Sequence, residues 1–299
     1  MATIDLQGVK EGNTRAIARA ISLIESGYAE ELHLIDFHHS RHIPVMGITG
    51  PPGAGKSTLV DKLIQQVIDA GKRVAVLCVD PSSPFHNGSI LGDRIRLNSW
   101  YNHKNVFIRS LASRGAVGGL HPQIMEITSL LNLAPFDYII IETVGVGQNE
   151  VAIVGLADVS VVVLVPEAGD DIQTMKSGLM EIADIFVINK SDRPDAGKFL
   201  ANLKRTIQQQ LHPKKHALPI LQTVATQNEG IGELFAVINK TILEDHPHKS
   251  SWLLAERAYA MIARHRMRDV SKHKLIAEIE QLQAEKAFDF YTFVARFNN

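Results

Sequence analysis

The segment of the sequence with the clearest chemistry is a glycine-rich stretch that directly follows a short apolar run. It reads Gly50-Pro51-Pro52-Gly53-Ala54-Gly55-Lys56-Ser57, followed by Thr58, and it matches the pattern G-x-x-x-x-G-K-[ST] in full. Glycines here let consecutive backbone N–H groups turn inward without a Cβ clash, so that they form a cradle for phosphate oxygens. The N-terminus of the helix predicted after the loop adds partial positive charge. The stretch therefore predicts a phosphate-binding loop.

Two side chains at the end of this loop extend the prediction to a nucleoside triphosphate. Lys56 would reach the β- and γ-phosphates, and the Ser57 hydroxyl would ligate Mg²⁺. The alternative interpretation is a chance glycine-rich loop. The flanks argue against chance, because an apolar run precedes the motif and the periodic stretch TLVDKLIQQVIDA follows it.

Isolated carboxylates end two of the apolar runs, where parallel sheets bind their ligands. Asp80 ends VLCVD and Glu142 ends YIIIE. Because Mg²⁺ takes few protein oxygens and completes its shell with water and phosphate, both are candidate magnesium ligands beside Ser57. Glu142 followed by Gly145 has the layout of a Walker-B acid and a glycine that senses the γ-phosphate, and Asp93 lies in a long segment that could close over the nucleotide. For each carboxylate alone, the alternative is a solvated loop position.

A second motif points to the base of the nucleotide. The sixth apolar run ends in Asn189-Lys190-Ser191-Asp192, an N-K-x-D sequence. The Asp192 carboxylate can accept from both N1–H and the exocyclic amine of guanine, whereas adenine presents no such pair of donors. The Lys190 stem would cover the base, Asn189 would contact the ring edge and the phosphate loop, and a backbone N–H within Val224-Ala225-Thr226 could reach the guanine carbonyl. The motif order favours GTP over ATP.

These motifs need strands and helices to position them, and the hydrophobic pattern predicts both. Seven nearly continuous apolar runs are typical of strands buried on both faces, at residues 43–49, 74–79, 106–111, 138–143, 159–165, 185–188 and 218–224. Periodic segments predict helices at residues 56–70, 123–134, 172–183, 195–210 and 232–243. The pattern predicts an α/β fold of the P-loop NTPase type, with a doubly wound, mainly parallel sheet of about seven strands.

Helical segments precede and follow this predicted domain. An amphipathic stretch that Asn13 or Thr14 can cap and Gly27 can end predicts one N-terminal helix. Helical patterns at residues 252–268, 275–286 and 288–297 follow the last strand. We therefore predict an N-terminal helical extension at 1–42, a P-loop GTPase domain at 43–246 and a C-terminal helical arm at 247–299. The final stretch FDFYTFVARF is too short to bury its own phenylalanines, so it either folds back or packs on a partner chain.

Composition excludes several classes of protein. The 299 residues carry a net charge of -1, which gives no electrostatic footprint for nucleic acid or an anionic membrane. The longest apolar run is far shorter than the ~20 residues of a membrane span, and the N-terminal residues lack a signal-peptide apolar core. A single cysteine, Cys78, excludes an internal disulfide framework. The sequence predicts a cytoplasmic enzyme.

Taken with longer motifs, these residues resemble a known family. The stretches are VDPSSPFHNGSILGDR, RSLASRGAVGGL, ETVGVGQNE and PEAGDDIQTMKSG. They resemble the ArgK/MeaB family of P-loop GTPases from the helix GNTRAIARAISLIESG to about residue 232, with a weaker likeness in the C-terminal helices. Members act as G-protein chaperones of adenosylcobalamin-dependent acyl-CoA mutases, mainly methylmalonyl-CoA mutase. The resemblance implies that GTP hydrolysis gates cofactor delivery to the mutase and protects it.

The resemblance also implies roles for individual residues. Lys56 and Ser57 become phosphate and magnesium residues, and Asp80 and Asp93 become switch carboxylates around the magnesium. Glu142 and Gly145 become the switch that senses the γ-phosphate. The loop at residues 167–176 is similar to an additional switch that relays nucleotide state to the mutase. The C-terminal helices resemble a homodimerisation arm.

The sequence departs from the family pattern at two places. Val224 stands where a serine is usual in the guanine loop, although recognition through the backbone survives that change. The C-terminal arm is short, so its dimer contact would be smaller than usual or absent. In addition, Val146 occupies the position at which many signalling GTPases carry a water-orienting glutamine. We therefore expect slow intrinsic hydrolysis, with the partner completing the site.

Other functions remain open on the sequence. A metallochaperone GTPase is one, because His33, His38, His39 and His42 cluster before the first strand, although no C-x-x-C accompanies them. An older family label gives an ATPase or kinase of arginine/ornithine transport. Direct cobalamin binding is disfavoured, since Arg41 replaces the glycine of D-x-H-x-x-G. A non-enzymatic scaffold would bind its partner in the same way whatever the nucleotide.

Overall fold

The structure, a computed structural model, divides the chain into two compact units, Met1–Pro247 and His248–Asn299. It describes residues 3–26, 42–80, 97–113, 120–144, 153, 155–167, 183–210, 218–244, 255, 258–259, 262–263, 266–267 and 269–297. Several predictions fall outside these described residues, among them Asp93, Gly145 and all but Ala183 of the helix at 172–183.

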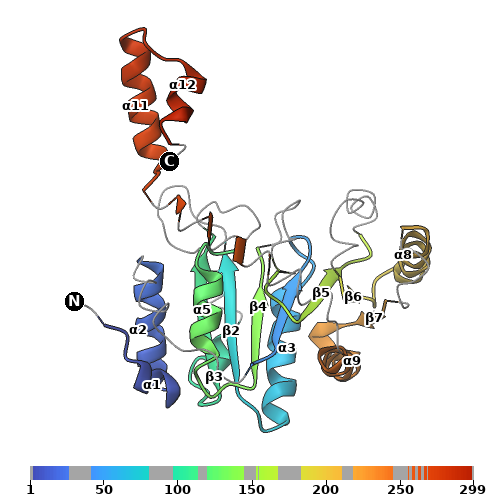
Figure 1. Cartoon of the computed structure of the whole chain (residues 1–299). Helices are drawn as coiled ribbons and strands as arrows, with labels where there is room; N and C mark the ends of the chain where they lie inside the picture. The colour runs from blue at the N-terminus through green and yellow to red at the C-terminus, as the bar shows by residue number, and fades with distance from the viewer. Residues whose placement is uncertain are drawn as a thin grey trace. The chain divides into compact units, whose positions relative to one another are not determined.

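Seven parallel strands form one sheet in the first unit (Figure 1). They are β1 (Val45–Thr49), β2 (Val74–Asp80), β3 (Val106–Ala112), β4 (Tyr138–Glu142), β5 (Val159–Leu164), β6 (Ile185–Asn189) and β7 (Ile220–Thr223). Their order across the sheet is β3-β2-β4-β1-β5-β6-β7, and every neighbouring pair is parallel. The carboxyl ends of all strands therefore lie along one edge of the sheet. The predicted fold class is confirmed, and each strand begins and ends within two residues of its predicted bounds.

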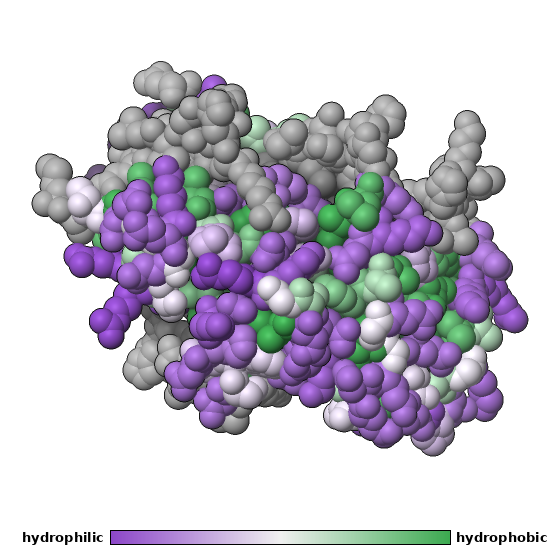
Figure 2. Space-filling view, turned by 90° about the horizontal axis from the view of Figure 1, so that it is seen from below, coloured by the Kyte–Doolittle hydropathy of each residue, from purple (hydrophilic) through white to green (hydrophobic). Residues whose placement is uncertain are grey.

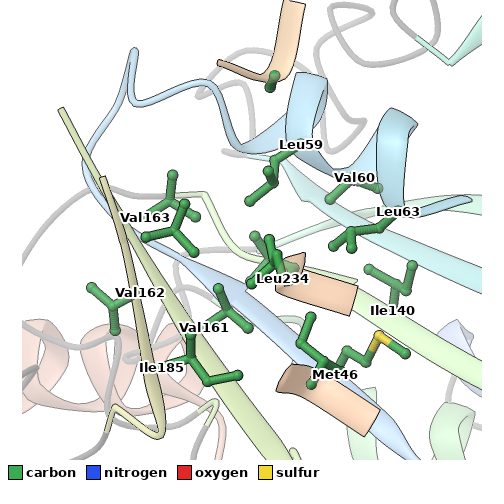
Figure 3. Close-up of a cluster of buried hydrophobic side chains, with 14 of the residues drawn as sticks. Met46, Leu59, Val60, Leu63, Ile140, Val161, Val162, Val163, Ile185 and Leu234 are labelled. Atoms are coloured by element: carbon green, nitrogen blue, oxygen red, sulfur yellow. The ribbon is translucent and has the colours of Figure 1, made fainter. Parts of the chain in front are cut away.

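The strand sequences are almost wholly apolar because both faces of the sheet are covered. Every residue of β1, β2, β4, β5 and β6 is buried, whereas β7, at one edge, is only partly buried. Alternate residues of β2 and β4, such as Val76 and Ile140, join one core cluster. Figure 3 shows Ile140 in this cluster with Leu63 and Leu234. The intervening residues of these strands are equally buried, so they face a second apolar layer.

Helices supply both layers (Figure 1). Among the described residues of the first unit they are α1 (Leu6–Lys10), α2 (Thr14–Glu25), α3 (Lys56–Asp69), α5 (Ile124–Leu131), α8 (Ala196–Gln210) and α9 (Ile231–Leu243), with short 3-10 helices η2 (Asn98–Trp100) and η5 (Ala225–Gln227). α3 packs on α9, and α2 packs on α5. The helix predicted at the N-terminus is present as α2, and its N-cap Asn13 accepts from the N–H groups of Arg15 and Ala16.

The sequence analysis missed α1, which has only five residues. Such a short helix shows no apolar periodicity, so the residue that caps it is the feature of the sequence that indicates it. The Asp5 carboxylate accepts a hydrogen bond of 2.9 Å from the N–H of Gly8, and the buried Val9 places the helix on the first unit. An Asx residue before a short apolar stretch could have indicated it.

The second unit contains α11 (Lys272–Ala284) and α12 (Phe290–Ala295) among its described residues. Asp289 caps α12 by accepting from the N–H of Thr292 at 2.8 Å. Hydrogen bonds from Thr292 to the carboxylate lower the pKa of Asp289 below its ordinary value. Phe293 is buried between Phe288 and Phe297.

The surface of the molecule is mostly hydrophilic when viewed from below, with hydrophobic residues in small separate patches (Figure 2). Within the described part of the chain, none of the helices combines the length and the apolar character needed to cross a membrane.

Candidate nucleotide-binding site

The glycine-rich loop connects β1 to α3, as its flanking sequences predict, and two of its glycines are required by close contacts. Gly50 has φ +139°, and a Cβ there would lie 2.1 Å from the carbonyl oxygen of Val163. Gly55 has φ +88°, and a Cβ there would lie 2.4 Å from Nδ2 of Asn189. The loop can approach its neighbours this closely only because these positions carry no side chain.

The other members of the motif form the rest of the loop. Pro52 and Gly53 are exposed, Pro51 and Thr58 are half-buried, and Ala54 is fully buried. The loop is thus open to solvent at Pro52 and Gly53 and anchored in the core at Ala54, as a phosphate-binding loop at the surface must be.

Lys56 is the first residue of α3, and its side chain lies along the loop. Nζ donates hydrogen bonds to the carbonyl oxygens of Gly50 at 2.8 Å and Pro51 at 3.1 Å. Gly55 is the N-cap of α3, so no side chain caps this helix. The ammonium group and the helix N-terminus therefore lie at the same loop, an arrangement suited to phosphate.

The predicted magnesium residues described by the structure come from the ends of β2 and β4 and from the start of α3. The Ser57 hydroxyl at the start of α3 donates to Oε1 of Glu142 at 2.7 Å, and both side chains are buried. Glu142 is the last residue of β4 and pairs in register with Ile48 of β1. Asp80 is the last residue of β2 and is also buried.

The donor set fits Mg²⁺ because it consists of a hydroxyl and carboxylates, which are hard oxygen ligands. Across the residues that the structure describes, there is no group of three or more His, Cys, Asp or Glu side chains able to hold a metal by themselves. An ion here would complete its shell with phosphate oxygens and water, as Mg²⁺ does. Asp93 and Gly145, which were predicted to join this site, lie outside the described residues.

Two threonines that the sequence analysis missed lie directly behind this part of the site. The hydroxyls of Thr49 and Thr143 are 2.9 Å apart and buried, and they join the ends of β1 and β4. The backbone N–H of Thr143 also donates to the carbonyl of Ile48 at 3.0 Å. A hydroxyl residue at the end of β1 and another directly after the neighbouring β4 could have signalled this pair.

Asn189 connects the predicted base-reading motif to the phosphate loop. Its Nδ2 donates to the carbonyl of Ala54 at 2.9 Å. Its Oδ1 accepts from the Thr223 hydroxyl at 3.1 Å and from the N–H of Ala225 at 3.2 Å. The side chain is buried, so one amide joins the phosphate loop, β6 and the end of β7.

The rest of the motif forms a turn after β6. Lys190 has φ +56°, an uncommon conformation for a residue with a Cβ, and its Nζ donates to the carbonyl of Gly53 at 2.7 Å. Asp192 is exposed. The Ser191 hydroxyl donates to the carbonyl of Thr223 at 3.0 Å, so the turn is also joined to β7.

The loop predicted to reach the guanine carbonyl lies beside this turn. Val224 and Ala225 are buried, and Thr226 is exposed. The N–H of Ala225 donates to Asn189, which fixes the loop relative to the base-reading motif. Thr223 was missed by the sequence analysis. Its signal is a hydroxyl residue that stands in register with Asn189 on the neighbouring strand.

One ion pair adds to the charges around the turn. Arg193 donates to Oε1 of Glu167, which lies shortly after β5. This hydrogen bond lowers the pKa of Glu167 below its ordinary value, and the charges of Arg193 and Lys190 act in the same direction.

The histidine cluster that suggested a metallochaperone is mostly outside the described residues. His42 is described, and its Nε2 lies 3.0 Å from Oδ1 of Asp158, whose Oδ2 accepts from the N–H of Val45. This contact lies at the beginning of β1, at the edge of the sheet opposite the phosphate loop.

Known proteins resemble this chain along most of its length. The family described as methylmalonyl-CoA mutase-associated GTPase MeaB matches residues 17–279. A protein of Pyrococcus abyssi whose name describes a GTPase is 46% identical over 243 residues, which cover 79% of this chain and 74% of that protein. A fused isobutyryl-CoA mutase of Cupriavidus metallidurans is 34% identical over 318 residues, which cover 95% of this chain and 29% of that protein.

A solved structure supports the fold. The crystal structure described as a LAO/AO transport system kinase matches with a TM-score of 0.64 at 22% identity, and the match covers 98% of this chain and 94% of that one. The nucleotide motifs therefore stand on the expected fold, and the Pyrococcus abyssi relative, whose match covers 79% of this chain, is a GTPase by name. The chain belongs to the MeaB family of methylmalonyl-CoA mutase-associated GTPases and is itself a GTPase that binds guanine nucleotide.

Proposed function

We propose that this GTPase is a chaperone whose nucleotide cycle gates adenosylcobalamin delivery to an acyl-CoA mutase, such as methylmalonyl-CoA mutase, and protects that enzyme. The observation that carries the proposal is the match to the fused isobutyryl-CoA mutase. Nearly the whole of this chain matches a segment that makes up 29% of that protein. A relative that joins such a segment to a mutase in one polypeptide supports a mutase as the partner. The same proposal implies a cytoplasmic location.

The geometry supports a division of roles among the site residues. Lys56 would bind the β- and γ-phosphates, and the first turn of α3 would orient them. Ser57, Asp80 and Glu142 would hold Mg²⁺, with Asp93 as a further carboxylate. When bound, Mg²⁺ neutralises charge that develops on the phosphate oxygens. Because the Ser57 proton is directed at Glu142, the lone pairs of the hydroxyl oxygen are available to a cation.

On the base side, Asp192 would accept from N1–H and the exocyclic amine of guanine, and the Lys190 stem would cover the base. The buried Asn189 holds the turn against the phosphate loop. Gly145 would sense the γ-phosphate. Because Val146 stands where a water-orienting glutamine is common, intrinsic hydrolysis is slow in this proposal, and the mutase completes the site.

We also propose that the C-terminal arm forms a homodimer. Apolar side chains of α11 and α12 are exposed, and α12 buries only Phe293 of its six residues. The exposed set consists of Ile276, Phe290, Tyr291, Val294 and Phe297. An exposed group of this kind is typical of an interaction surface. Analytical ultracentrifugation of the full chain tests this, and a monomer at all concentrations contradicts it.

The deciding experiment measures steady-state GTP hydrolysis with and without the adenosylcobalamin-dependent mutase of the same organism. We expect a large acceleration by the mutase. We also expect transfer of adenosylcobalamin to the apo-mutase that depends on the nucleotide. If both effects are absent while GDP binding is intact, the protein is still a GTPase, but the proposed chaperone role is wrong. The Lys56→Ala variant is the control, because a scaffold that needs no nucleotide would bind the mutase equally well with it.

A further inference from the structure

One contact of the site joins residues to which the proposed function gives no part in phosphate or magnesium binding. It is the ion pair between Glu167 and Arg193, which joins the loop after β5 to the turn after β6. The two strands are neighbours in the sheet, and Leu164 pairs in register with Ile188. Each partner therefore follows a fixed strand end by only a few residues.

Arg193 belongs to the same turn as the base-reading motif. Its N–H donates to the carbonyl of Lys190 at 3.1 Å, which closes the turn around Asp192. Lys190 extends from one side of this turn to the phosphate loop, where Nζ donates to the carbonyl of Gly53. Arg193 extends from the other side to Glu167. The turn that carries the Asp192 carboxylate is thus held by Lys190 and Arg193 as well as by the contact of Ser191 with β7.

The charges around Glu167 fit this arrangement. The hydrogen bond from Arg193 is the main cause of the lowered pKa of Glu167, and Lys190 contributes at longer range. Both cations belong to the base-reading turn. Glu167 therefore stays ionised and attracts the turn from the side of β5.

We propose that Glu167 and Arg193 are positioning residues for base selection, which hold the turn so that the Asp192 carboxylate meets the N1–H and the exocyclic amine of guanine together. This inference rests on the proposed role of Asp192 as the base reader. The two residues act through Asp192 and do not touch the base themselves.

The competing interpretation is an ordinary surface ion pair. Side chains that are 44% and 52% exposed, as these are, commonly contribute little to stability. The chain offers a matched control in the pair Lys198–Asp195, which is separated by 2.7 Å, is also exposed and lies just after the same turn. That pair joins neighbouring positions at the start of α8 and reaches no other strand.

The test compares the affinities of GDP and IDP, because inosine retains N1–H and lacks the exocyclic amine. Calorimetry on the full chain would measure both nucleotides with wild type, Glu167→Gln, Arg193→Met, the double variant and Lys198→Met. We expect each single variant to weaken GDP binding by about 1.5- to fivefold, the range of an exposed ion pair. IDP binding should change less, so that the preference for GDP falls. The double variant should lose no more GDP affinity than one single variant does. Lys198→Met should bind both nucleotides as wild type does.

Equal losses for GDP and IDP, or no loss, would overturn the inference. Asp192→Asn separates this failure from failure of the base assignment. Suppose that Asp192→Asn prefers xanthosine diphosphate to GDP, while Glu167→Gln keeps the wild-type ratio of GDP and IDP affinities. Asp192 is then confirmed as the base reader, and only the positioning role of Glu167 and Arg193 is wrong. If Asp192→Asn binds GDP as wild type does, the base assignment itself is wrong.

Discussion

The phosphate side and the base side of the site are built differently. On the phosphate side, the functional side chains of Lys56, Ser57 and Glu142 are at most 7% exposed and leave directly from helix or strand ends. On the base side, Asp192 is exposed, Lys190 and Ser191 are half-buried, and all three lie on a turn. Asn189 is the buried residue that joins the two sides.

This difference indicates where rigidity is used. Stabilising charge on the phosphates needs donors fixed before the reaction, and burial among strand ends supplies that. Reading a base requires the nucleotide to enter and leave past the reader, so an exposed turn held by a few contacts is sufficient. Substitutions on the phosphate side should therefore affect both folding and function, and those at Asp192 should affect function alone.

The largest effect is expected for Lys56→Ala. Loss of the ammonium group should lower GTP hydrolysis by about a hundredfold or more, the cost of removing one donor that stabilises the transition state. The measurement is single-turnover hydrolysis at saturating GTP, with circular dichroism as the control for folding. Hydrolysis within tenfold of wild type would mean that the loop contacts of Lys56 are structural only.

The next largest effect comes from two glycines of the phosphate loop, which differ in whether a side chain would collide with a neighbouring residue. Gly55→Ala should lower the free energy of unfolding by about 2–4 kcal/mol, because a left-handed conformation and a collision with Asn189 add together. Gly53→Ala is the control. It has a similar positive φ and nothing within 4 Å of its Cβ, so it should cost only about 1–2 kcal/mol. Equal losses in chemical denaturation would show that Asn189 can move away freely.

Asp192→Asn should weaken GDP binding by about ten- to a hundredfold and favour xanthosine diphosphate, since the amide repels one of the two guanine donors. Because Asp192 is exposed, the free energy of unfolding should change by no more than about 0.5 kcal/mol. A stability loss as large as that of Gly55→Ala would contradict the comparison between the two sides.

The smallest effect is expected for Thr223→Val, which removes the hydroxyl donor to Asn189 and keeps the shape. The Asn189 oxygen still accepts from Ala225, so the free energy of unfolding should fall by only about 1 kcal/mol. The control is Thr226→Val at an exposed neighbouring position, whose free energy of unfolding should lie within about 0.5 kcal/mol of the wild-type value. If both variants unfold alike, the Thr223 bond does not hold the base-reading turn.

The fold and the sequence motifs could be predicted because their signals are local. Strands buried on both faces need long apolar runs, which mark them in the sequence. Where a motif follows such a run, its residues are predicted to lie at the end of that strand. The motif segments 50–57 and 189–192 thus came to the same edge of the sheet, as parallel strands require.

The contact of Asn189 with the phosphate loop was predicted from its motif, and its bond to Ala54 confirms it. Other contacts within the site were not predicted, because they join residues that are distant in sequence. Nothing in the local spacing shows that Thr49 meets Thr143 or that Glu167 pairs with Arg193. Such contacts depend on strand order, and the order β3-β2-β4-β1-β5-β6-β7 does not follow the chain. The missed helix α1 has a different cause, since five residues are too few to show a period.

The place of β1 in that order has a further consequence. The strand that leads into the phosphate loop is the middle one of seven, with three strands on each side. Partial opening of the molecule begins where contacts are fewest, at the outer strands, and would reach β1 last. Amide hydrogens of β1 should therefore exchange with solvent most slowly, and the loop that binds phosphate would persist through every opening short of complete unfolding.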